Sequence, residues 1–173
     1  MMNTEISYAT AQDARAIAEI HVASWREAYR DLLPEPYLAG LDVAELEARF
    51  RQATEDRMCD VLLARRDGVL QGWLHCDPAR DPGVPTTEGE IMAHNVAPTA
   101  WSSGVGQSLW LRAKDILIQR GYMTSILWVF AQDERAIRFY RSAGFAPTPP
   151  TPRRVELGGM SCELVRYSRP IDR

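Results

Sequence analysis

The feature that most constrains the fold is a strand, a loop of small residues and a helix in the middle of the chain. Glu90–Pro98 (EIMAHNVAP) is a strand candidate, and the loop Thr99–Gly106 (TAWSSGVG) follows it. From Gly106 to Arg120 apolar residues recur at helical spacing, and Gly121 is the stop signal. The run Thr124–Ala131 (TSILWVFA) is almost continuously apolar, which is typical of a strand buried on both faces. These elements together predict a parallel β-α-β unit.

The rest of the chain contains short elements whose ends are marked by capping residues, proline or glycine. An Asp67-Gly68 pair between two β-rich runs predicts a hairpin, and the proline-rich stretches 78–87 and 147–152 predict loops or extended connections. The predicted elements are strands at 6–9, 60–65, 69–75, 90–96, 124–131, 153–155 and 160–167, and helices at 10–29, 43–53, 106–120 and 133–143.

The order of these elements, β-α-α-β-β-β-α-β-α-β-β, predicts an α/β fold of the mixed α+β kind. Strands joined by short turns pair antiparallel. We therefore expect a mixed, mostly antiparallel central sheet that contains the parallel β-α-β unit and is flanked by about four helices. The chain of 173 residues, 46% hydrophobic and 25% charged, suits a single globular domain spanning 1–173 rather than a disordered tail.

Charge, hydropathy and cysteine spacing argue against several classes of protein. Twenty Lys and Arg against 23 Asp and Glu give a net charge of −3, so a nucleic-acid binder that relies on a strong positive field is not expected. Apolar stretches are far shorter than the ~20 residues of a membrane span, and the N-terminus lacks a signal-peptide pattern. We expect a cytoplasmic protein without membrane contact. Cys59, Cys76 and Cys162 are widely spaced and form no CxxC pair, which predicts reduced thiols and no metal site.

The loop before the central helix has the composition of an anion-binding site. Ser102, Ser103, Gly104, Val105 and Gly106 lead into a helix N-terminus, where backbone N–H groups are unpaired and the helix dipole is positive. Such a loop can approach a pyrophosphate closely. The chain has no Gly-Lys-Ser/Thr of a P-loop, and the third glycine of a dinucleotide fingerprint is missing. On this motif alone, a tight strand-to-helix turn is the alternative interpretation.

Several motifs occur in one fixed order. They are Val96-x-Pro98, the pair Gly104 and Gly106, the amphipathic helix, the buried strand, and the helix motif 136–145 (AIRFYRSAGF). This combination resembles the GNAT superfamily of acyl-CoA-dependent N-acyltransferases over about Glu88 to Phe145. The segment 21–34 is similar to the first helix and substrate loop of many bacterial members, and 163–167 is similar to their last strand.

The resemblance implies a GNAT-like fold in which 88–145 is the acyl-CoA-binding core and 1–57 supplies the N-terminal strand, two helices and the acceptor loop. It implies an N-acetyltransferase that uses acetyl-CoA as co-substrate and needs no metal. The acceptor would be a primary amine of a small molecule, or the N-terminus or a lysine of a peptide or protein. Members of the superfamily are often dimers, so a homodimer is a further expectation.

The resemblance also implies which residues hold acetyl-CoA. The backbone N–H near Val96 would hold the thioester oxygen in the manner of an oxyanion hole, and residues 101–106 would cradle the pyrophosphate. Two positions depart from the family pattern. Trp101 stands where Gln or Arg is usual, so a side-chain contact to phosphate is lost. Asp133 stands where many members have an Asn that reaches the pantetheine arm, and a helix N-cap explains Asp133 equally well.

In this family the amine attacks the thioester directly, so a base, an acid and a held thioester are needed. Glu90 matches the position of the family's general base, and His94 is the second candidate. In an unbulged strand the two share a face about 13 Å apart. Tyr140 matches the helix tyrosine that gives the departing thiolate its proton, because both groups titrate near pH 10. The alternatives are a solvated strand-end carboxylate for Glu90, a wall residue for His94 and an amphipathic core residue for Tyr140.

Trp25, Tyr29, Leu32 and Leu33 suggest an aromatic, apolar wall on the acceptor side. The altered residues Trp101 and Asp133 leave a second function open, a non-catalytic acyl-CoA-binding or sensing module. A nucleotide-binding regulatory domain with the same anion cradle is a third, which the missing P-loop lysine disfavours.

Overall fold

The computed structural model describes residues 3–55, 60–150 and 152–171, and eight strands in these residues form one sheet. The order across the sheet is β1-β2-β3-β4-β5-β8-β6, and β7 pairs with β8 beside this path. The strands are β1 (Glu5–Tyr8), β2 (Asp60–Arg66), β3 (Val69–Pro78), β4 (Glu88–Val96), β5 (Thr124–Phe130), β6 (Ala146–Pro147), β7 (Arg153–Leu157) and β8 (Met160–Pro170).

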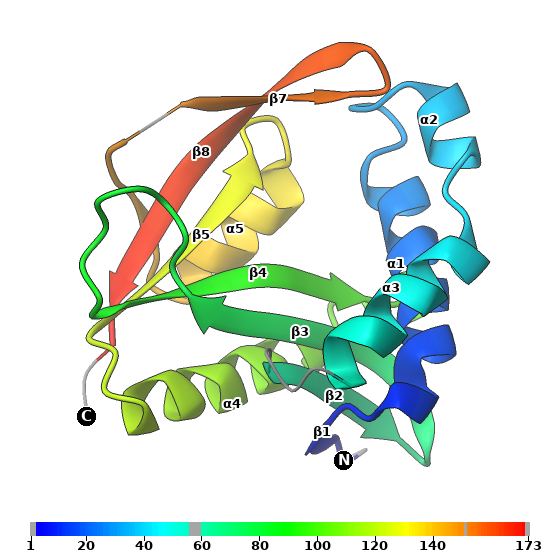
Figure 1. The fold of residues 1–173 in the computed structure, drawn as a ribbon, viewed down its shortest axis with the longest axis horizontal. Coiled ribbons are helices and arrows are strands. Elements are labelled where there is room, and N and C mark those ends of the chain that lie inside the picture. Colours follow the sequence, from blue (N-terminus) through cyan, green and yellow to red (C-terminus); the bar gives the residue numbers. More distant parts are fainter. Residues whose placement is uncertain (1–2, 56–59, 151, 172–173) are drawn as a thin grey trace.

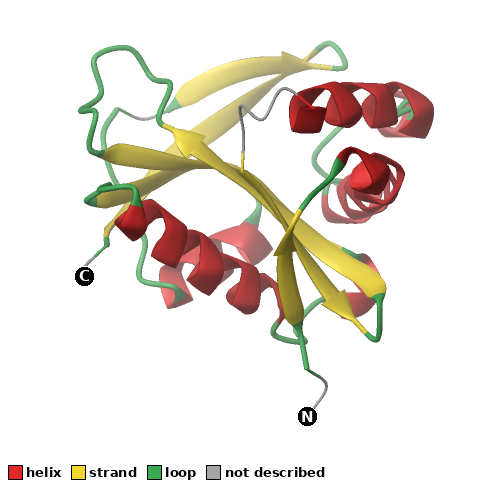
Figure 2. Cartoon of the chain, turned by 60° about the horizontal axis from the view of Figure 1, so that its bottom comes forward, coloured by secondary structure: helices red, strands yellow, loops and turns green. Residues whose placement is uncertain are grey.

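Among the described strands, β4 and β5 are parallel neighbours and the other pairs are antiparallel. The predicted mixed sheet with one parallel β-α-β unit is therefore confirmed. The helices are α1 (Ala14–Ala28), α2 (Glu35–Ala39), α3 (Val43–Glu55), α4 (Val105–Gln119) and α5 (Glu134–Ser142), with 3-10 turns at Ala11–Asp13 and Pro98–Ala100. Helices α4 and α5 lie on one face of the sheet, and α1 with α3 covers the other (Figures 1 and 2).

Local sequence signals explain how the N-terminal helices begin. The capping box predicted at Thr10 and Asp13 is present, and the Asp42 carboxylate accepts a hydrogen bond from the Glu45 N–H at 3.0 Å. Helix α2 was not predicted, because the prolines of 31–36 favoured a loop. Pro36 stands in the first turn of α2, where a helix needs no N–H donor, so proline is compatible with it.

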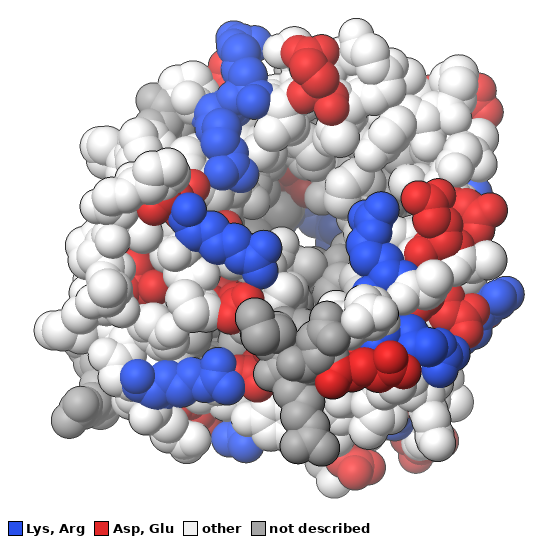
Figure 3. Space-filling model, in the orientation of Figure 1, with Lys and Arg blue, Asp and Glu red and all other residues white. Residues whose placement is uncertain are grey.

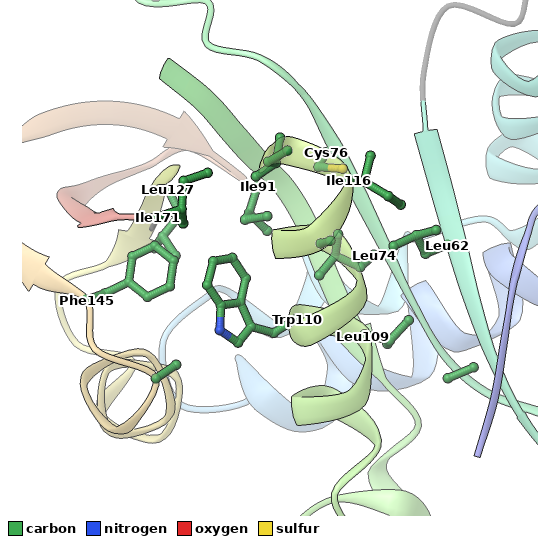
Figure 4. Packing of buried hydrophobic residues seen from close by; sticks show 14 of the residues in the cluster. Leu62, Leu74, Cys76, Ile91, Leu109, Trp110, Ile116, Leu127, Phe145 and Ile171 are labelled. Carbon is green, nitrogen blue, oxygen red and sulfur yellow. The ribbon is translucent and has the colours of Figure 1, made fainter. Parts of the chain in front are cut away.

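The largest part of the core lies between α4 and the sheet. Leu109, Trp110 and Ile116 project from α4 toward Leu74 of β3 and Leu127 of β5 (Figure 4). This packing fixes the N-terminus of α4 against the middle of the sheet. Cys76 belongs to the same core as an unpaired thiol, Cys162 is a buried unpaired thiol elsewhere, and Cys59 lies outside the described residues. None of the described helices has the length and apolar composition needed to cross a bilayer.

Strand β4 contains a bulge, whereas the prediction that Glu90 and His94 share a face assumed a regular strand. Cys76 of β3 pairs with Ile91, whereas the adjacent His75 pairs with Ala93, so Met92 is an extra residue in β4. A bulge shifts the alternation of side chains by one position. The expectation that Glu90 and His94 share a face is therefore wrong: Glu90 points to the α1 face and His94 to the α4 face.

Candidate active site

The site lies where β4 and β5 separate. Their pairing runs from Glu88↔Thr124 to Ile91↔Leu127, and beyond this point the two strands diverge next to the bulge at Met92. A cavity of about 720 Å³ occupies the gap and is lined by both strands, α1, α5 and the start of α4. Figure 3 shows the molecule hollowed near its middle, between α1 and β5, with basic and acidic side chains interspersed around the hollow. The gap connects the two faces of the sheet.

The loop before α4 forms the predicted anion cradle in part. Ser102 and Gly104 adopt left-handed backbone angles, with φ of 59° and 88°, and turn the chain into α4. Ser102, Gly104 and Gly106 line the cavity together with Gln107. A Cβ built at Gly104 would meet no heavy atom within 4 Å, so the backbone here borders open space. The unpaired N–H groups of the first helical turn can therefore reach an anion.

Two residues of the predicted cradle do not line the cavity. Ser103 turns away: its hydroxyl donates to the Ala100 carbonyl at 2.6 Å, and its own carbonyl accepts a hydrogen bond from Arg66 at 2.6 Å. The Val105 side chain is fully buried in the core beneath α4. The side chains of these two residues stabilise the loop, and only their backbone groups could contact a ligand in the cavity.

The Trp101 side chain makes two contacts that were not predicted from the sequence. Its indole N–H donates to the Val96 carbonyl at 2.8 Å, and the guanidinium of Arg135 lies 3.7 Å above the indole ring centre. Arg135 and Arg138, both from α5, line the cavity. The positively charged side chains that line the cavity in the described residues therefore come from α5.

The backbone of Val96 faces the cavity. The N–H of the next residue, Ala97, is bonded to Gln71 beside β3, whereas the Val96 carbonyl turns toward Trp101. Since the N–H and C=O of one strand residue point to the same edge, the Val96 N–H faces the diverging edge of β4. Val96 also lines the cavity.

His94 and Tyr140 meet at the α5 side of the cavity. The Tyr140 hydroxyl lies 3.5 Å from His94 Nδ1, and His94 Nε2 is buried without a hydrogen-bond partner among the described residues. Burial lowers the pKa of His94 to about 4, so its ring is neutral at physiological pH. Burial also raises the pKa of Tyr140, and the nearby Tyr29 and Asp133 raise it further. The phenol therefore keeps its proton, as an acid must.

Glu90 lies on the opposite face of β4 and does not line the cavity. It is 8% exposed, and its carboxylate accepts a hydrogen bond from the Arg80 backbone N–H at 3.3 Å. Burial raises the pKa of Glu90, and the Arg80 N–H partly offsets this effect. Glu90 shares the acceptor side of the sheet with α1 and is separated from the gap by Met92.

An aromatic cluster forms the α1 wall of the cavity. The ring centres of Tyr29 and Phe130 are 4.9 Å apart and those of Trp25 and Tyr29 5.0 Å apart, both edge to face. Two further lining residues join α1 to β4, because the Ser24 hydroxyl donates to the Asn95 side-chain oxygen at 3.0 Å. Phe130 and Asn95 were not predicted from the sequence, although both lie on strands of the predicted β-α-β unit.

Leu32 and Leu33, predicted for the same wall, do not line the cavity. Leu33 is buried with Leu38 and Cys162 below the β7–β8 hairpin, and the lining residues Trp25, Tyr29 and Phe130 pack against this cluster. The prediction rested on apolar character and on the resemblance to a substrate loop, and neither distinguishes a residue behind the wall from one that lines the cavity.

Asp133 joins the two halves of the cavity. Its Oδ1 accepts a hydrogen bond from the Ala136 N–H at 3.0 Å, which confirms it as the N-cap of α5. It is 6% exposed and lines the cavity together with Tyr29 and Tyr140.

Comparisons with known proteins agree with this geometry. The family model described as the acetyltransferase (GNAT) family matches residues 14–145. The uncharacterised N-acetyltransferase YuaI of Bacillus subtilis is 26% identical over 94% of this chain and 90% of its own length. A mycothiol acetyltransferase of Cellulomonas flavigena is 35% identical over 72% of this chain, which spans 37% of that protein.

A similar solved structure is the PaiA N-acetyltransferase of Thermoplasma acidophilum in complex with coenzyme A. It superposes with a TM-score of 0.74 at 19% identity and covers 95% of this chain and 98% of its own. At this identity the likeness concerns the fold, with its open mixed sheet and its diverging parallel strands. Together with the family match over most of the chain, these findings establish that the chain belongs to the GNAT family of acetyltransferases.

Proposed function

We propose that this acetyltransferase moves the acetyl group of acetyl-CoA to the primary amine of a small molecule or peptide, across the gap between β4 and β5. The observation that carries the proposal is the continuous cavity. It joins the anion cradle of α4 to the aromatic wall of α1 and has Tyr140 at its side. A cofactor on one face of the sheet and an amine on the other can meet there.

The cradle suits the pyrophosphate of acetyl-CoA. Open space at Gly104 and the unpaired N–H groups of the first turn of α4 leave room for a bulky anion, and Arg135 supplies a cation beside them. The Val96 N–H would hold the carbonyl oxygen of the thioester. When bound, acetyl-CoA supplies a thioester carbonyl for attack by the amine and a thiolate as leaving group.

Tyr140 is the proposed acid for the thiolate. A phenol in this buried position stays protonated, and its ordinary pKa is close to that of an alkyl thiol, which favours the transfer. His94 is the proposed neutral partner that orients the Tyr140 hydroxyl, because its Nδ1 lies 3.5 Å away and its ring carries no charge above about pH 4. A weakly basic ring of this kind does not suit removal of a proton from an alkylammonium.

Glu90 is the proposed base for the amine. Its carboxylate lies on the acceptor side, and its raised pKa makes it a better proton acceptor near neutral pH than an exposed glutamate. Because Glu90 does not line the cavity, the proposal requires a water between the amine and the carboxylate to relay the proton.

The first prediction concerns acetyl-CoA binding. At 100 times its Kd, acetyl-CoA should stabilise the protein by about 2.7 kcal/mol, measured as a thermal shift. Gly106→Ala should weaken this shift strongly, because its methyl group enters the cradle wall. The fold should tolerate the change, since the new Cβ would lie 3.5 Å from both His94 Nε2 and Phe139 Cε2, an ordinary contact distance. Substitution at Gly104 would be less clean because of its positive φ.

Ser108→Ala is the matched control, since this exposed hydroxyl bonds the Gly104 carbonyl within α4 and does not line the cavity. It should leave the shift unchanged. A folded wild-type protein that shows no shift would overturn the proposal. A shift without CoA release across a panel of amines would favour the non-catalytic acyl-CoA-binding module instead.

A further inference from the structure

We propose that Asp133 binds the ammonium group of the acceptor, and that the rest of the acceptor is an uncharged apolar or aromatic body. The inference rests on the proposed acetyl transfer and adds the chemical class of the amine. It assigns to Asp133 a contact with the acceptor in place of the pantetheine contact that the family resemblance implied.

Asp133 lies at a position where it can contact an acceptor amine. The residue follows β5, with its N–H bonded to the Phe130 carbonyl at 3.0 Å, so it sits at the end of the diverging strand. Within the cavity it lies close to Tyr29, the C-cap of α1, and to Tyr140 on α5, and its charge raises the pKa of both phenols more than the charge of Arg135 lowers it. A group bound by Asp133 would therefore lie between the aromatic wall and the proposed acid.

One carboxylate oxygen of Asp133 is available to a ligand. Oδ1 caps α5, whereas Oδ2 has no donor among the residues that the structure describes. The side chain is more than nine-tenths buried and borders the cavity. Because Asp133 lines the cavity, Oδ2 is free to accept a hydrogen bond from a ligand there. An asparagine here could cap the helix equally well, but it could not offset a positive charge.

The charges around the cavity point to an ammonium group. Among the described lining residues Asp133 is the one carboxylate, and Arg135 and Arg138 are the charged residues of opposite sign. Arg135 is held over Trp101 beside the cradle, and His94 and His21 are neutral because burial lowers the pKa of each to about 4. An alkylamine is mostly protonated at neutral pH. A single carboxylate can therefore draw it to the gap.

The composition of the wall points to the body of the acceptor. Trp25, Tyr29 and Phe130 present aromatic surface, and Met92 and Ala93 add apolar surface from β4. The Ser24 hydroxyl bonds the Asn95 side-chain oxygen, and the lining residue His21 has a buried Nδ1 without a hydrogen-bond partner among the described residues. In the described part of this wall no second carboxylate would hold a polyamine, and aromatic and apolar side chains outnumber the polar ones, which disfavours an amino sugar. An arylalkyl monoamine fits both the charge and the surface.

The test uses 2-phenylethylamine as the probe, with spermidine and glucosamine as contrasting amines. Binding of 2-phenylethylamine to the CoA-loaded protein is measured by calorimetry, and its KM by CoA release. Asp133→Asn should weaken binding and raise this KM about tenfold or more, because an ammonium–carboxylate contact is lost. The KM for acetyl-CoA should stay within about twofold. The melting temperature should also hold, since Asn caps a helix as well as Asp does.

Glu134→Gln is the matched control. It removes a neighbouring carboxylate from the first turn of α5, but Glu134 has an 86% exposed side chain and does not line the cavity. Its parameters should equal those of the wild type. An unchanged affinity and KM for 2-phenylethylamine in Asp133→Asn would overturn the inference, as would a rise confined to the KM for acetyl-CoA.

If the wild type prefers spermidine or glucosamine to 2-phenylethylamine, the proposal that the acceptor has an apolar body is overturned. The outcome is separable from the proposed function. If acetyl-CoA binds but no amine yields CoA, acetyl transfer fails, while calorimetry with 2-phenylethylamine still decides whether Asp133 binds an ammonium group.

Discussion

Individual residues divide the proposed chemistry between the two faces of the sheet. The bulge at Met92 places His94 with Tyr140 on the cofactor side and Glu90 on the acceptor side. A sequence cannot show this division, because one extra residue in a strand leaves no compositional signal. Glu90 and Tyr140 are candidates because they match the family pattern, and His94 because it lies on the same strand as Glu90, whereas the geometry that relates the three residues was not predictable.

At the residue scale, Tyr140→Phe tests the proposed acid. The ring and its packing remain and only the hydroxyl is lost, so acetyl-CoA affinity should hold while kcat falls by roughly 10²-fold or more. Steady-state kinetics with a chemistry-limited amine measures both values. Tyr167→Phe is the matched control, because Tyr167 is 3% exposed and does not line the cavity. Equal kcat values for the two variants would show that Tyr140 only packs in the core and is not the acid.

Glu90→Gln tests the proposed base through the pH profile. A base works only when deprotonated, so activity should rise with pH through the pKa of Glu90, which burial places above the ordinary glutamate value. The variant should remove this rising limb, so kcat/KM should fall most above the pKa of Glu90, where the wild-type carboxylate is deprotonated. His94 should add no limb near neutrality, since its pKa of about 4 keeps it neutral there. A rising limb that survives in Glu90→Gln but is lost in His94→Gln would contradict these assignments.

At the scale of elements, the C-terminal end of α4 packs closely against β4. Gly89 makes this approach possible, because a Cβ there would lie 2.6 Å from Leu117 Cδ2 and 3.2 Å from the Tyr122 ring. Sequence periodicity predicted α4 and both strands of the crossover. It could not predict α2, whose five residues carry too little periodicity, nor the placement of Leu33 beneath the hairpin.

Gly89→Ala tests this packing. The added methyl group must displace Leu117 or shift α4, which should lower the free energy of unfolding by about 1–3 kcal/mol, measured by denaturant titration. Gly106→Ala, in which the new Cβ makes ordinary contacts, should change it by less than about 1 kcal/mol. Equal stabilities of the two variants would show that the α4–β4 distance is not set at Gly89.

At the scale of the whole molecule, the fold brings β4, β5, α1, α5 and the start of α4 to one gap, and no single segment of the sequence describes it. The fold class was predictable, because helix spacing and buried-strand composition are local signals. The position of Arg135 over the Trp101 ring was not predictable, since it depends on a contact between residues 34 positions apart in sequence. The position of Asp133 in the cavity lining was not predictable either.

The most direct measurement is a crystal structure of the protein with CoA and 2-phenylethylamine. The account predicts the pyrophosphate against the N–H groups at the start of α4, with Arg135 beside it. It predicts the sulfur in the gap between β4 and β5 within reach of the Tyr140 hydroxyl, and the amine next to Asp133. CoA bound away from the α4 N-terminus, or a sulfur that does not reach the gap, would contradict the account.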